Sequence, residues 1–371
     1  MKLSINRAAL LRSLNHVQSV VERRNTIPIL SNVLMKTDDG ALIMSTTDMD
    51  LEISESVEAK IKTPGATTAP AHTLFDIVRK LPEDSDVTLE LNDGGNVMTV
   101  KAGRSTFKLS CLPVADFPEI GAKELPTAFD IPAAELRALI DRTKFAMSTE
   151  ETRYYLNGIY VHQADNGKVK VLRAVATDGH RLARFEMPLP EGAAGMPGVI
   201  VPRKAVGELR KLLEEAADTI RVSLSQSKIR FDFDHIVMTS KLIDGTFPNY
   251  EQVIPVGNDK TVEVNPKIFS IAIDRVSTIS DGKSRAVKIA LHGKVMTLSA
   301  NSPESGSATE DLEVNSNDNL EIGFNARYLL DITQQIAGDG CRITLADAAS
   351  PTIIQDTGDL SALYVLMPLR V

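Results

Sequence analysis

The order of hydrophobic and polar positions repeats three times along the chain. Each copy opens with a short alternating strand that leads into a helix with one apolar face, and these pairs occupy residues 3–5 with 8–21, 129–131 with 133–147, and 262–264 with 266–279. With Ile5, Ile131 and Val264 taken as equivalent, successive copies are 126 and 133 residues apart (131 − 5 and 264 − 131). This spacing is the length of one small domain, so the pattern predicts three copies of one domain.

The rest of each copy predicts antiparallel strands and a second helix. Turns at Asp38–Gly40, Asp165–Gly167 and His292–Gly293 separate paired apolar stretches, as β-hairpins require. The second helices are predicted at residues 72–80, 203–217 and 325–337, with more strands after each.

The predicted fold class is α+β, with two helices of each domain packed on antiparallel sheets. The expected domains are residues 1–125, 126–256 and 257–371. Repetition by itself leaves the function open, because duplicated domains also occur in enzymes and adhesins.

The first helix has two different faces. Its apolar face is Leu10, Leu14, Val17 and Val21, and the same spacing on the other side gives Arg12, His16, Ser19 and Arg23. We expect the apolar face to pack on a sheet and the polar, cationic face to point toward something else.

Charge is unevenly distributed between helices and the rest of the chain. Six helical segments (7–24, 72–80, 133–147, 203–217, 265–279 and 325–337) together carry +7, and the whole chain carries −8, so the remainder carries −15 (−8 minus 7). We interpret this as helices that line a basic inner surface and sheets that form an acidic exterior. Such a surface holds phosphates without reading bases. The alternative is that helices merely favour lysine and arginine.

The remaining composition limits the class of protein. No apolar run approaches the roughly 20 residues that span a bilayer, and we do not expect the N-terminal residues to act as a secretion signal. Cys111 and Cys341 are the only cysteines, so a disulfide framework and a cysteine zinc site are excluded, and a cytoplasmic location is expected.

Catalytic interpretations find little support, and we expect no enzyme activity and no cofactor. Gly282-Lys283-Ser284 resembles the end of a phosphate-binding loop, but Ser277 stands where that loop needs glycine. Asp178 and His180 lack a visible nucleophile, although a hydrolase that uses them stays a hypothesis. The six histidines show no metal-ligand spacing, so no metal site is expected. A scaffold that binds only proteins is the other alternative.

Six segments in order give the chain a resemblance to a known family. They are Arg24–Leu30, Arg153–Gly158, Ala176–Ala183, Val201–Lys204, Phe247–Tyr250 and Tyr364–Val371. With them, the whole chain resembles the β subunit of bacterial DNA polymerase III, the sliding clamp. The resemblance implies a head-to-tail homodimer whose six domains form a ring around double-stranded DNA, without sequence specificity. The helix around Val276 and Ile279 would be near one subunit interface.

The same resemblance implies a pocket between domains two and three. It would bind short, mostly apolar peptides of the polymerase III α subunit, the clamp loader and repair proteins, and so confer processivity. The pocket residues carried over are Leu156, Thr177, Gly179, His180, Arg181, Leu182, Pro248, Val253, Asn325, Tyr328, Val365, Met367, Pro368, Leu369 and Arg370. Leu182, Val253, Met367 and Pro368 suit the burial of leucine or phenylalanine side chains.

For DNA, the resemblance points to six residues. They are Arg24, Arg79, Tyr154, Tyr155, Arg203 and Lys204. Adjacent tyrosines can stack on bases of a single-stranded end, and one of the two is expected to face inward. Three departures from the family pattern, Glu150, Gln252 and Ser284, affect the expected DNA contact and peptide preference.

The first two repeats can be compared where the pocket is expected. Repeat one has Thr46-Thr47-Asp48-Met49-Asp50-Leu51, and repeat two has Ala176-Thr177-Asp178-Gly179-His180-Arg181-Leu182. Aligning the two leucines makes Gly-His-Arg special to repeat two. We expect Gly179 to permit a tight turn.

Overall fold

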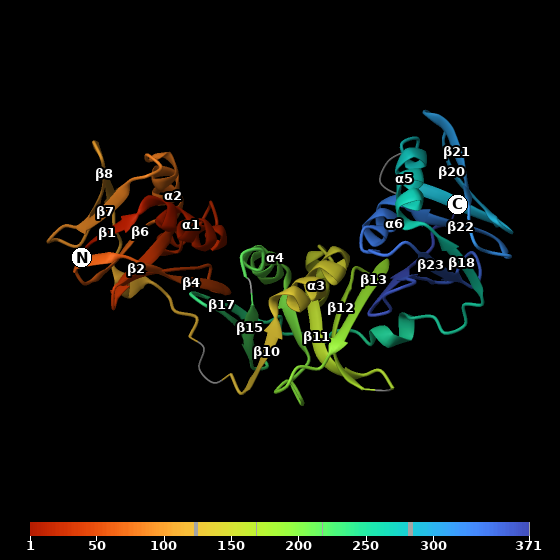
Figure 1. Cartoon of the computed structure of the whole chain (residues 1–371), viewed down its shortest axis with the longest axis horizontal. Coiled ribbons are helices and arrows are strands. Elements are labelled where there is room, and N and C mark those ends of the chain that lie inside the picture. Colours follow the sequence, from red (N-terminus) through yellow and green to blue (C-terminus); the bar gives the residue numbers. More distant parts are fainter. Residues whose placement is uncertain (122–124, 168, 217, 281–284, 371) are drawn as a thin grey trace. The chain divides into compact units, whose positions relative to one another are not determined.

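The computed structural model describes the chain except residues 122–124, 168, 217, 281–284 and 371. Figure 1 labels its helices and strands. The chain divides into two compact units. Unit 1 is Met1–Ala134, Pro190–Ala193 and Lys204–Leu242, and unit 2 is Glu135–Leu189, Ala194–Arg203 and Ile243–Val371. None of the described helices is long and apolar enough to cross a membrane.

Unit 1 holds two antiparallel sheets. The five-stranded sheet has the order β5-β1-β7-β8-β9, and the first eight-stranded sheet has the order β10-β15-β16-β17-β4-β3-β2-β6. Their strands are β1 (Lys2–Asn6), β2 (Asn32–Asp38), β3 (Ala41–Thr47), β4 (Leu51–Glu58), β5 (Lys60–Thr63), β6 (Ala66–Pro70), β7 (Asp86–Leu91), β8 (Val97–Ala102), β9 (Ser105–Ser110), β10 (Thr127–Pro132), β15 (Thr219–Leu224), β16 (Lys228–Phe233) and β17 (Ile236–Lys241).

Unit 2 also holds two antiparallel sheets. The second eight-stranded sheet has the order β14-β11-β12-β13-β25-β24-β23-β18, and the four-stranded sheet has the order β21-β20-β19-β22. Their strands are β11 (Gly158–Asp165), β12 (Lys170–Thr177), β13 (Arg181–Pro188), β14 (Val199–Pro202), β18 (Lys260–Val264), β19 (Ala286–His292), β20 (Val295–Ser302), β21 (Gly306–Glu313), β22 (Asn319–Asn325), β23 (Cys341–Leu345), β24 (Thr352–Asp356) and β25 (Ala362–Leu366).

The predicted helices are present, and most are shorter than predicted. They are α1 (Arg7–Val17), α2 (Ala71–Lys80), α3 (Ala133–Thr143), α4 (Arg203–Leu212), α5 (Pro266–Ser277) and α6 (Ala326–Thr333). After α1 and α3 the last predicted turn is a tighter 3-10 helix, Gln18–Val20 and Lys144–Ala146, as is common where an α-helix ends. Asparagine side chains cap α1, α5 and α6, because Asn6, Asn265 and Asn325 accept the first free N–H groups.

Each eight-stranded sheet joins strands from two successive repeats. Strands β4 and β17 pair antiparallel from Ile236 opposite Glu55 to Ser240 opposite Leu51, and we call this pairing the first seam. Strands β13 and β25 pair in the same manner, with Leu182 opposite Val365, and we call this the second seam. The strand order β6-β2-β3-β4 recurs as β14-β11-β12-β13 and as β22-β19-β20-β21. The repeat seen in the sequence is therefore also a repeat of topology.

Candidate functional site

The second seam carries an apolar cluster that contains several predicted pocket residues. Leu156, Leu182 and Val365 are each at most 4% exposed and pack with Phe247 and Tyr250. The partly buried side chains packed against this cluster include Tyr155, Tyr160, Ile243, Ile254 and Ile353. Predicted pocket residues from segments 156–182 and 365 thus meet on one face of the sheet.

Two apolar side chains of the predicted pocket remain accessible. Val253 is 48% exposed at the end of the 3-10 helix Tyr250–Val253, and Met367 is 39% exposed just after β25. Large hydrophobic side chains on a surface commonly mark an interaction site when they adjoin an apolar patch. Pro248 lies in the segment between Phe247 and this 3-10 helix.

The turn at residues 178–181 is fixed by its own aspartate. One oxygen of Asp178 accepts the N–H groups of His180 and Arg181 at 2.9 and 3.0 Å. The hydroxyl of Thr177 donates to the Arg181 carbonyl at 2.7 Å, and Gly179 has φ +89°. This geometry turns the chain sharply into β13 and presents the His180 and Arg181 side chains.

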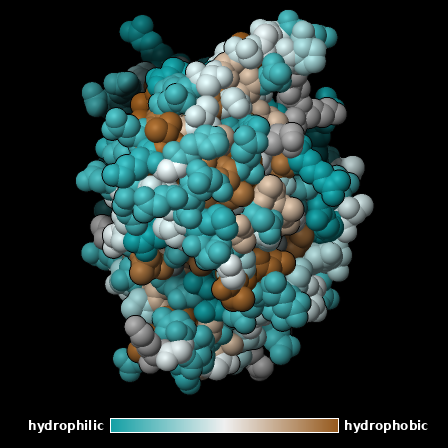
Figure 2. Space-filling view, turned by 90° about the vertical axis from the view of Figure 1, so that its right-hand side faces the viewer, coloured by the Kyte–Doolittle hydropathy of each residue, from teal (hydrophilic) through white to brown (hydrophobic). Residues whose placement is uncertain are grey.

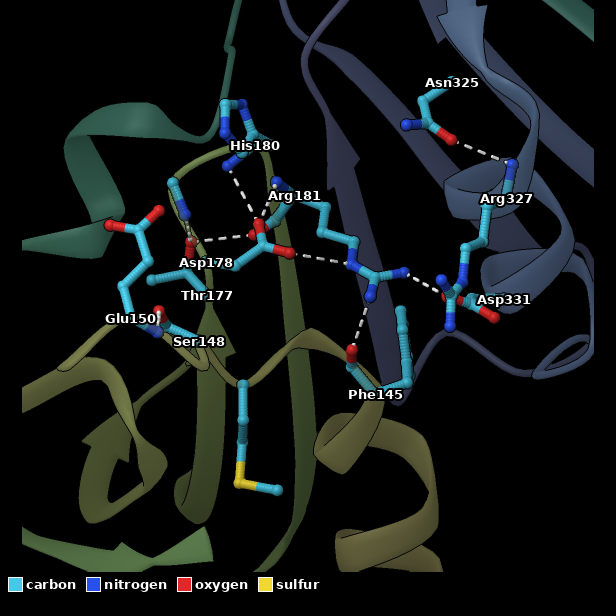
Figure 3. A network of polar contacts seen from close by, with 12 residues as sticks. Phe145, Ser148, Glu150, Thr177, Asp178, His180, Arg181, Asn325, Arg327 and Asp331 are labelled. Atoms are coloured by element: carbon cyan, nitrogen blue, oxygen red, sulfur yellow. Dashed lines mark hydrogen bonds and ion pairs between the residues drawn. The ribbon is translucent and has the colours of Figure 1, made fainter. Parts of the chain in front are cut away.

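Arg181 is the centre of a polar network (Figure 3). Its guanidinium pairs with Asp178 at 3.1 Å and with Asp331 at 2.5 Å, and it donates to the Phe145 carbonyl at 2.7 Å. It also lies 4.3 Å from the centre of the Tyr328 ring, a cation–π distance. Arg181 therefore joins β13 to α6 and is satisfied within the chain.

A cavity of about 560 Å³ opens beside this network. Its lining is mostly polar and includes Phe145, Met147, Ser148, Thr149, Glu150, Asp178, His180, Arg181, Arg203, Asn325, Arg327, Tyr328 and Asp331. Burial, together with the nearby Asp178 carboxylate, raises the pKa of Tyr328. Seven of the predicted pocket residues therefore fall into two groups, three in the apolar cluster and four in the lining of this polar cavity.

The C-terminal segment crosses from the turn to β22. The N–H of Met367 donates to the His180 carbonyl at 2.9 Å, and the N–H of Leu369 donates to the Gly323 carbonyl at 2.8 Å. Arg370 lies elsewhere, because it lines a depression on the four-stranded sheet with Lys288 and Ser299. Pro368 is held between these two backbone contacts.

The predicted DNA contacts have very different surroundings. Arg24 is exposed, and Arg79 is exposed beside Asp76, with which it pairs at 2.9 Å. Tyr154 is 53% exposed, whereas Tyr155 packs on the apolar cluster, so one tyrosine does face inward. Both belong to the 3-10 helix Glu151–Leu156.

Two predicted phosphate contacts are engaged within the chain instead. Lys204 lies 2.5 Å from Glu22 and 2.6 Å from Asp48, so two carboxylates neutralise its charge. Arg203 donates to the carbonyls of Met147 and Ser148, both at 2.6 Å, and burial lowers the pKa of its guanidinium.

Part of the polar face of α1 has partners within unit 1. His16 lies 2.8 Å from Glu55 and 3.2 Å from Glu215, and Arg12 pairs with Glu215 at 2.7 Å. Ser19 donates to Glu208 at 2.6 Å. These carboxylates come from β4 and from the segment of α4 and its C-terminal end, so much of this face is used for packing inside unit 1.

The alignment of Leu51 with Leu182, which made Gly-His-Arg special to repeat two, is wrong. Asp48 and Asp178 make the same turn, because each N–H donates to the carbonyl three residues later, Leu51 and Arg181. Leu51 is therefore equivalent to Arg181, and Leu182 is equivalent to Glu52. Met49 has φ +79°, so this turn does not require glycine. A Cβ at Gly179 would instead approach an Arg153 nitrogen to 2.6 Å.

The departures at Glu150 and Gln252 can also be placed. Glu150 pairs with Arg153 at 2.6 Å, and this hydrogen bond lowers the pKa of the Glu150 carboxyl. Its negative charge is thus partly compensated. Gln252 lies in the 3-10 helix that ends at Val253. Ser284 and the Gly282-Lys283-Ser284 sequence lie outside the described residues.

Sequence reasoning missed Asp331 and Phe145, the partners of Arg181 outside its own turn. Tyr328 and Asp331 are three positions apart on α6 and so lie on one helix face, a signal that was available. Phe145 contributes its backbone carbonyl, which no side-chain pattern indicates. In the described parts of the chain, no group of three or more acidic, histidine or cysteine residues could hold a metal ion.

Comparison with known proteins identifies the family. Models of the N-terminal, central and C-terminal domains of the DNA polymerase III beta subunit match residues 1–121, 130–249 and 251–370. The beta sliding clamp of Caulobacter vibrioides is 53% identical over 372 residues, and that of Escherichia coli K12 is 38% identical over 373, each with full coverage of both chains.

Solved structures agree with this result. A sliding clamp from Bartonella birtlesii bound to griselimycin has a TM-score of 0.97 and 50% identity, with 100% of both chains covered. The Caulobacter crescentus beta sliding clamp with a polyethylene glycol bound to its putative beta-motif tethering region has a TM-score of 0.98 and 53% identity, with 100% of this chain and 99% of that chain covered. The chain therefore belongs to the DNA polymerase III beta subunit family, the sliding clamps that tether polymerases to DNA.

Proposed function

We propose that two copies of this chain associate head to tail into a non-catalytic ring around double-stranded DNA, and that partner peptides bind at the second seam. The observation that carries the ring is the repeated strand order. Both seams join the fourth strand of one copy to the last strand of the next, whereas β21 and β9 are left as sheet edges among the described strands. Pairing β21 of one subunit with β9 of the other would extend the same rule.

The chemistry of the two edges supports this pairing. Strand β9 carries Lys108 and directly follows Arg104, whereas β21 carries Glu310, Asp311 and Glu313. Unpaired edges are templates for association, and opposite charges favour the mixed pair over two like edges. Because the contact joins unlike surfaces, it closes into a ring only when the rotation between subunits allows it.

Helix α5 is expected near this interface, through residues other than those first predicted. Val276 is 2% exposed and belongs to the core, whereas Ile268 and Ile271 are 55% and 54% exposed. On the face of the molecule drawn in Figure 2, hydrophobic side chains reach the surface in small patches among hydrophilic ones. Burial of Ile268, Ile271 and Phe107 in the dimer would remove exposed apolar surface from water.

The ring is tested by mass and by topology. A native mass of about twice 40.3 kDa is expected, and Ile271→Glu should yield monomers while Leu360→Glu, an exposed turn residue, should not. A loaded clamp should be retained on circular DNA and lost from linear DNA. Equal retention on both would exclude topological linkage.

The peptide site is supported by the apolar cluster and by the two exposed apolar side chains Val253 and Met367. Ending the chain after Leu366 removes Met367 and the segment beyond it but keeps Leu366, which is fully buried in β25. We expect this truncation to abolish binding of the polymerase α subunit and of the clamp loader while the dimer persists. Undiminished polymerase binding would refute the site.

DNA contact is assigned to Arg24 and Tyr154, with a smaller share for Lys204 because its charge is neutralised. Replacing Arg24 by alanine should weaken DNA binding and lower the salt slope by about 1. Lys204→Ala is the matched control and should change the slope less. The larger effect from Lys204 would reverse the assignment.

A further inference from the structure

The two seams have equivalent positions that can be matched strand by strand. In the first, Thr47 lies opposite Glu52, and Glu52 lies opposite Thr239 across the seam. In the second, Thr177 lies opposite Leu182, and Leu182 lies opposite Val365. The same registers extend the match to the neighbouring strands.

The matched positions differ in polarity. At the first seam they are Leu34, Ser45, Glu52, Arg230, Val237 and Thr239; at the second they are Tyr160, Val175, Leu182, Ile353, Leu363 and Val365. The second set forms or packs against the apolar cluster, whereas the first set lines a cavity of about 210 Å³ that contains charged groups. The sheet scaffold is shared, and its surface chemistry is not.

Both seams are also crossed by a connecting segment that begins with Phe-Pro. Phe247-Pro248 leads into the 3-10 helix Tyr250–Val253, whose end is exposed. Phe117-Pro118 leads instead into irregular chain at Glu119–Gly121, which lines the small cavity. Phe117 is buried with Ile29, Leu30 and Leu34, as Phe247 is buried in its own cluster.

Charged side chains hold this irregular segment against the sheet. The carboxylate of Glu52 accepts the N–H of Ile120 at 3.0 Å, and Lys228 donates to the carbonyl of Ile120 at 2.5 Å and to that of Gly121. Glu119 pairs with Lys36 at 3.3 Å. Burial raises the pKa of Glu52, and the Ile120 hydrogen bond opposes that rise. Both backbone groups of Ile120 are therefore bound by the sheet.

We propose that residues 117–121 act as a built-in ligand at the first seam, and that Glu52 and Lys228 keep partner peptides from this groove. The inference rests on the proposed peptide site at the second seam. An incoming apolar side chain would have to desolvate Glu52 and displace contacts that Ile120 already makes. The subunit consequently offers one peptide site although its scaffold occurs twice.

The test transfers the second-seam residues to the first seam. One variant carries Ser45→Val, Glu52→Leu, Arg230→Ile and Thr239→Val. A second variant adds Lys228→Met to release residues 117–121 from the sheet. The probe is griselimycin, titrated by calorimetry into wild type, Leu182→Glu and both variants, with folding checked by circular dichroism. We expect one molecule per subunit for wild type, none for Leu182→Glu, one for the four-residue variant and two for the five-residue variant, the second about 10- to 100-fold weaker.

The possible outcomes separate the two proposals. Wild type that binds no griselimycin, or Leu182→Glu that still binds it, overturns the second-seam site and with it this inference. A folded five-residue variant that still binds one molecule overturns the built-in ligand alone. Two molecules bound by the four-residue variant would remove Lys228 from the mechanism. Hydrogen exchange at the Ile120 amide, which should accelerate once Glu52 is replaced, reports release of the segment independently of binding.

Discussion

The turns at Asp48 and Asp178 share one backbone and differ in what they bind. In both, the aspartate accepts two N–H groups of its own turn, at 2.9 and 2.7 Å for Asp48 and at 2.9 and 3.0 Å for Asp178. At the first seam the second aspartate oxygen meets Lys204 of α4. At the second seam it meets Arg181 of its own strand, which continues to Asp331 of α6.

The contrast separates requirements of the fold from local chemistry. The turn needs threonine and aspartate, which satisfy its backbone, and both copies retain them. Each junction also needs a cation between the turn and the second helix of the following repeat, but the cation can come from either side. The other side chains at the two seams are required neither by the turn nor by the junction, so they can differ. One seam is therefore polar and the other apolar.

The largest effect is expected when the second seam is given the residue of the first. Leu182→Glu puts at the second seam the carboxylate that Glu52 supplies at the first, without an Ile120 N–H to accept. We expect a loss of about 3–5 kcal/mol in the free energy of unfolding, because an unpaired carboxylate enters an apolar cluster. Urea denaturation measures it, and Leu182→Met, with similar volume, should cost under about 1.5 kcal/mol. A cost for glutamate no larger than for methionine would contradict the burial of this position.

The two junction cations should differ in their contribution to stability. Arg181 is 10% exposed and serves two carboxylates, so Arg181→Met should lower the free energy of unfolding by about 2–4 kcal/mol. Lys204 is 36% exposed, so Lys204→Met should cost about 1 kcal/mol. Thermal and urea unfolding compare them. Equal costs would mean that burial does not distinguish the two junctions.

Met49 and Gly179 occupy equivalent positions in the two turns. Exchanging these residues should change the free energy of unfolding in opposite directions. Gly179→Met places a side chain at φ +89° beside Arg153 and should cost about 1 kcal/mol. Met49→Gly relieves the same conformation at φ +79° and should be neutral or stabilising by a few tenths of a kcal/mol. Two costs of equal size would show that Met49 contributes a contact that outweighs its backbone conformation.

The smallest expected effect is a pH dependence of the free energy of unfolding that arises at the first seam. Burial by itself would lower the pKa of His16, but hydrogen bonds and charge from Glu55 and Glu215 raise it. Stability from protonated His16 is therefore fully present below the unfolded pKa of about 6.5 and is lost as pH rises through the higher folded value. The difference in unfolding free energy between wild type and His16→Gln should shrink as pH rises through that window. A difference that grows with pH would contradict the sign.

The resemblance implies one pocket, but the structure places its predicted residues in different surroundings. Leu182 and Val365 belong to an apolar cluster, whereas His180 and Asn325 line a polar cavity. Arg370 belongs to neither. Successive residues of a strand point to opposite faces, so neighbours in sequence separate in space. Asn325 also proved to be the cap of α6, a local role that its position before the helix could have indicated.

The sequence by itself determined the threefold repeat, the strands, the helices and their caps, because backbone hydrogen bonding and the periods of apolar residues act over a few positions. Only the tertiary structure decided which charges meet. Asp331 is 150 positions from Arg181, and Glu215 is 203 positions from Arg12. Such pairs form because strands of successive repeats join in one sheet, and no local pattern encodes that join. The apolar surface of the second seam and the filled groove of the first seam both follow from this joining of strands.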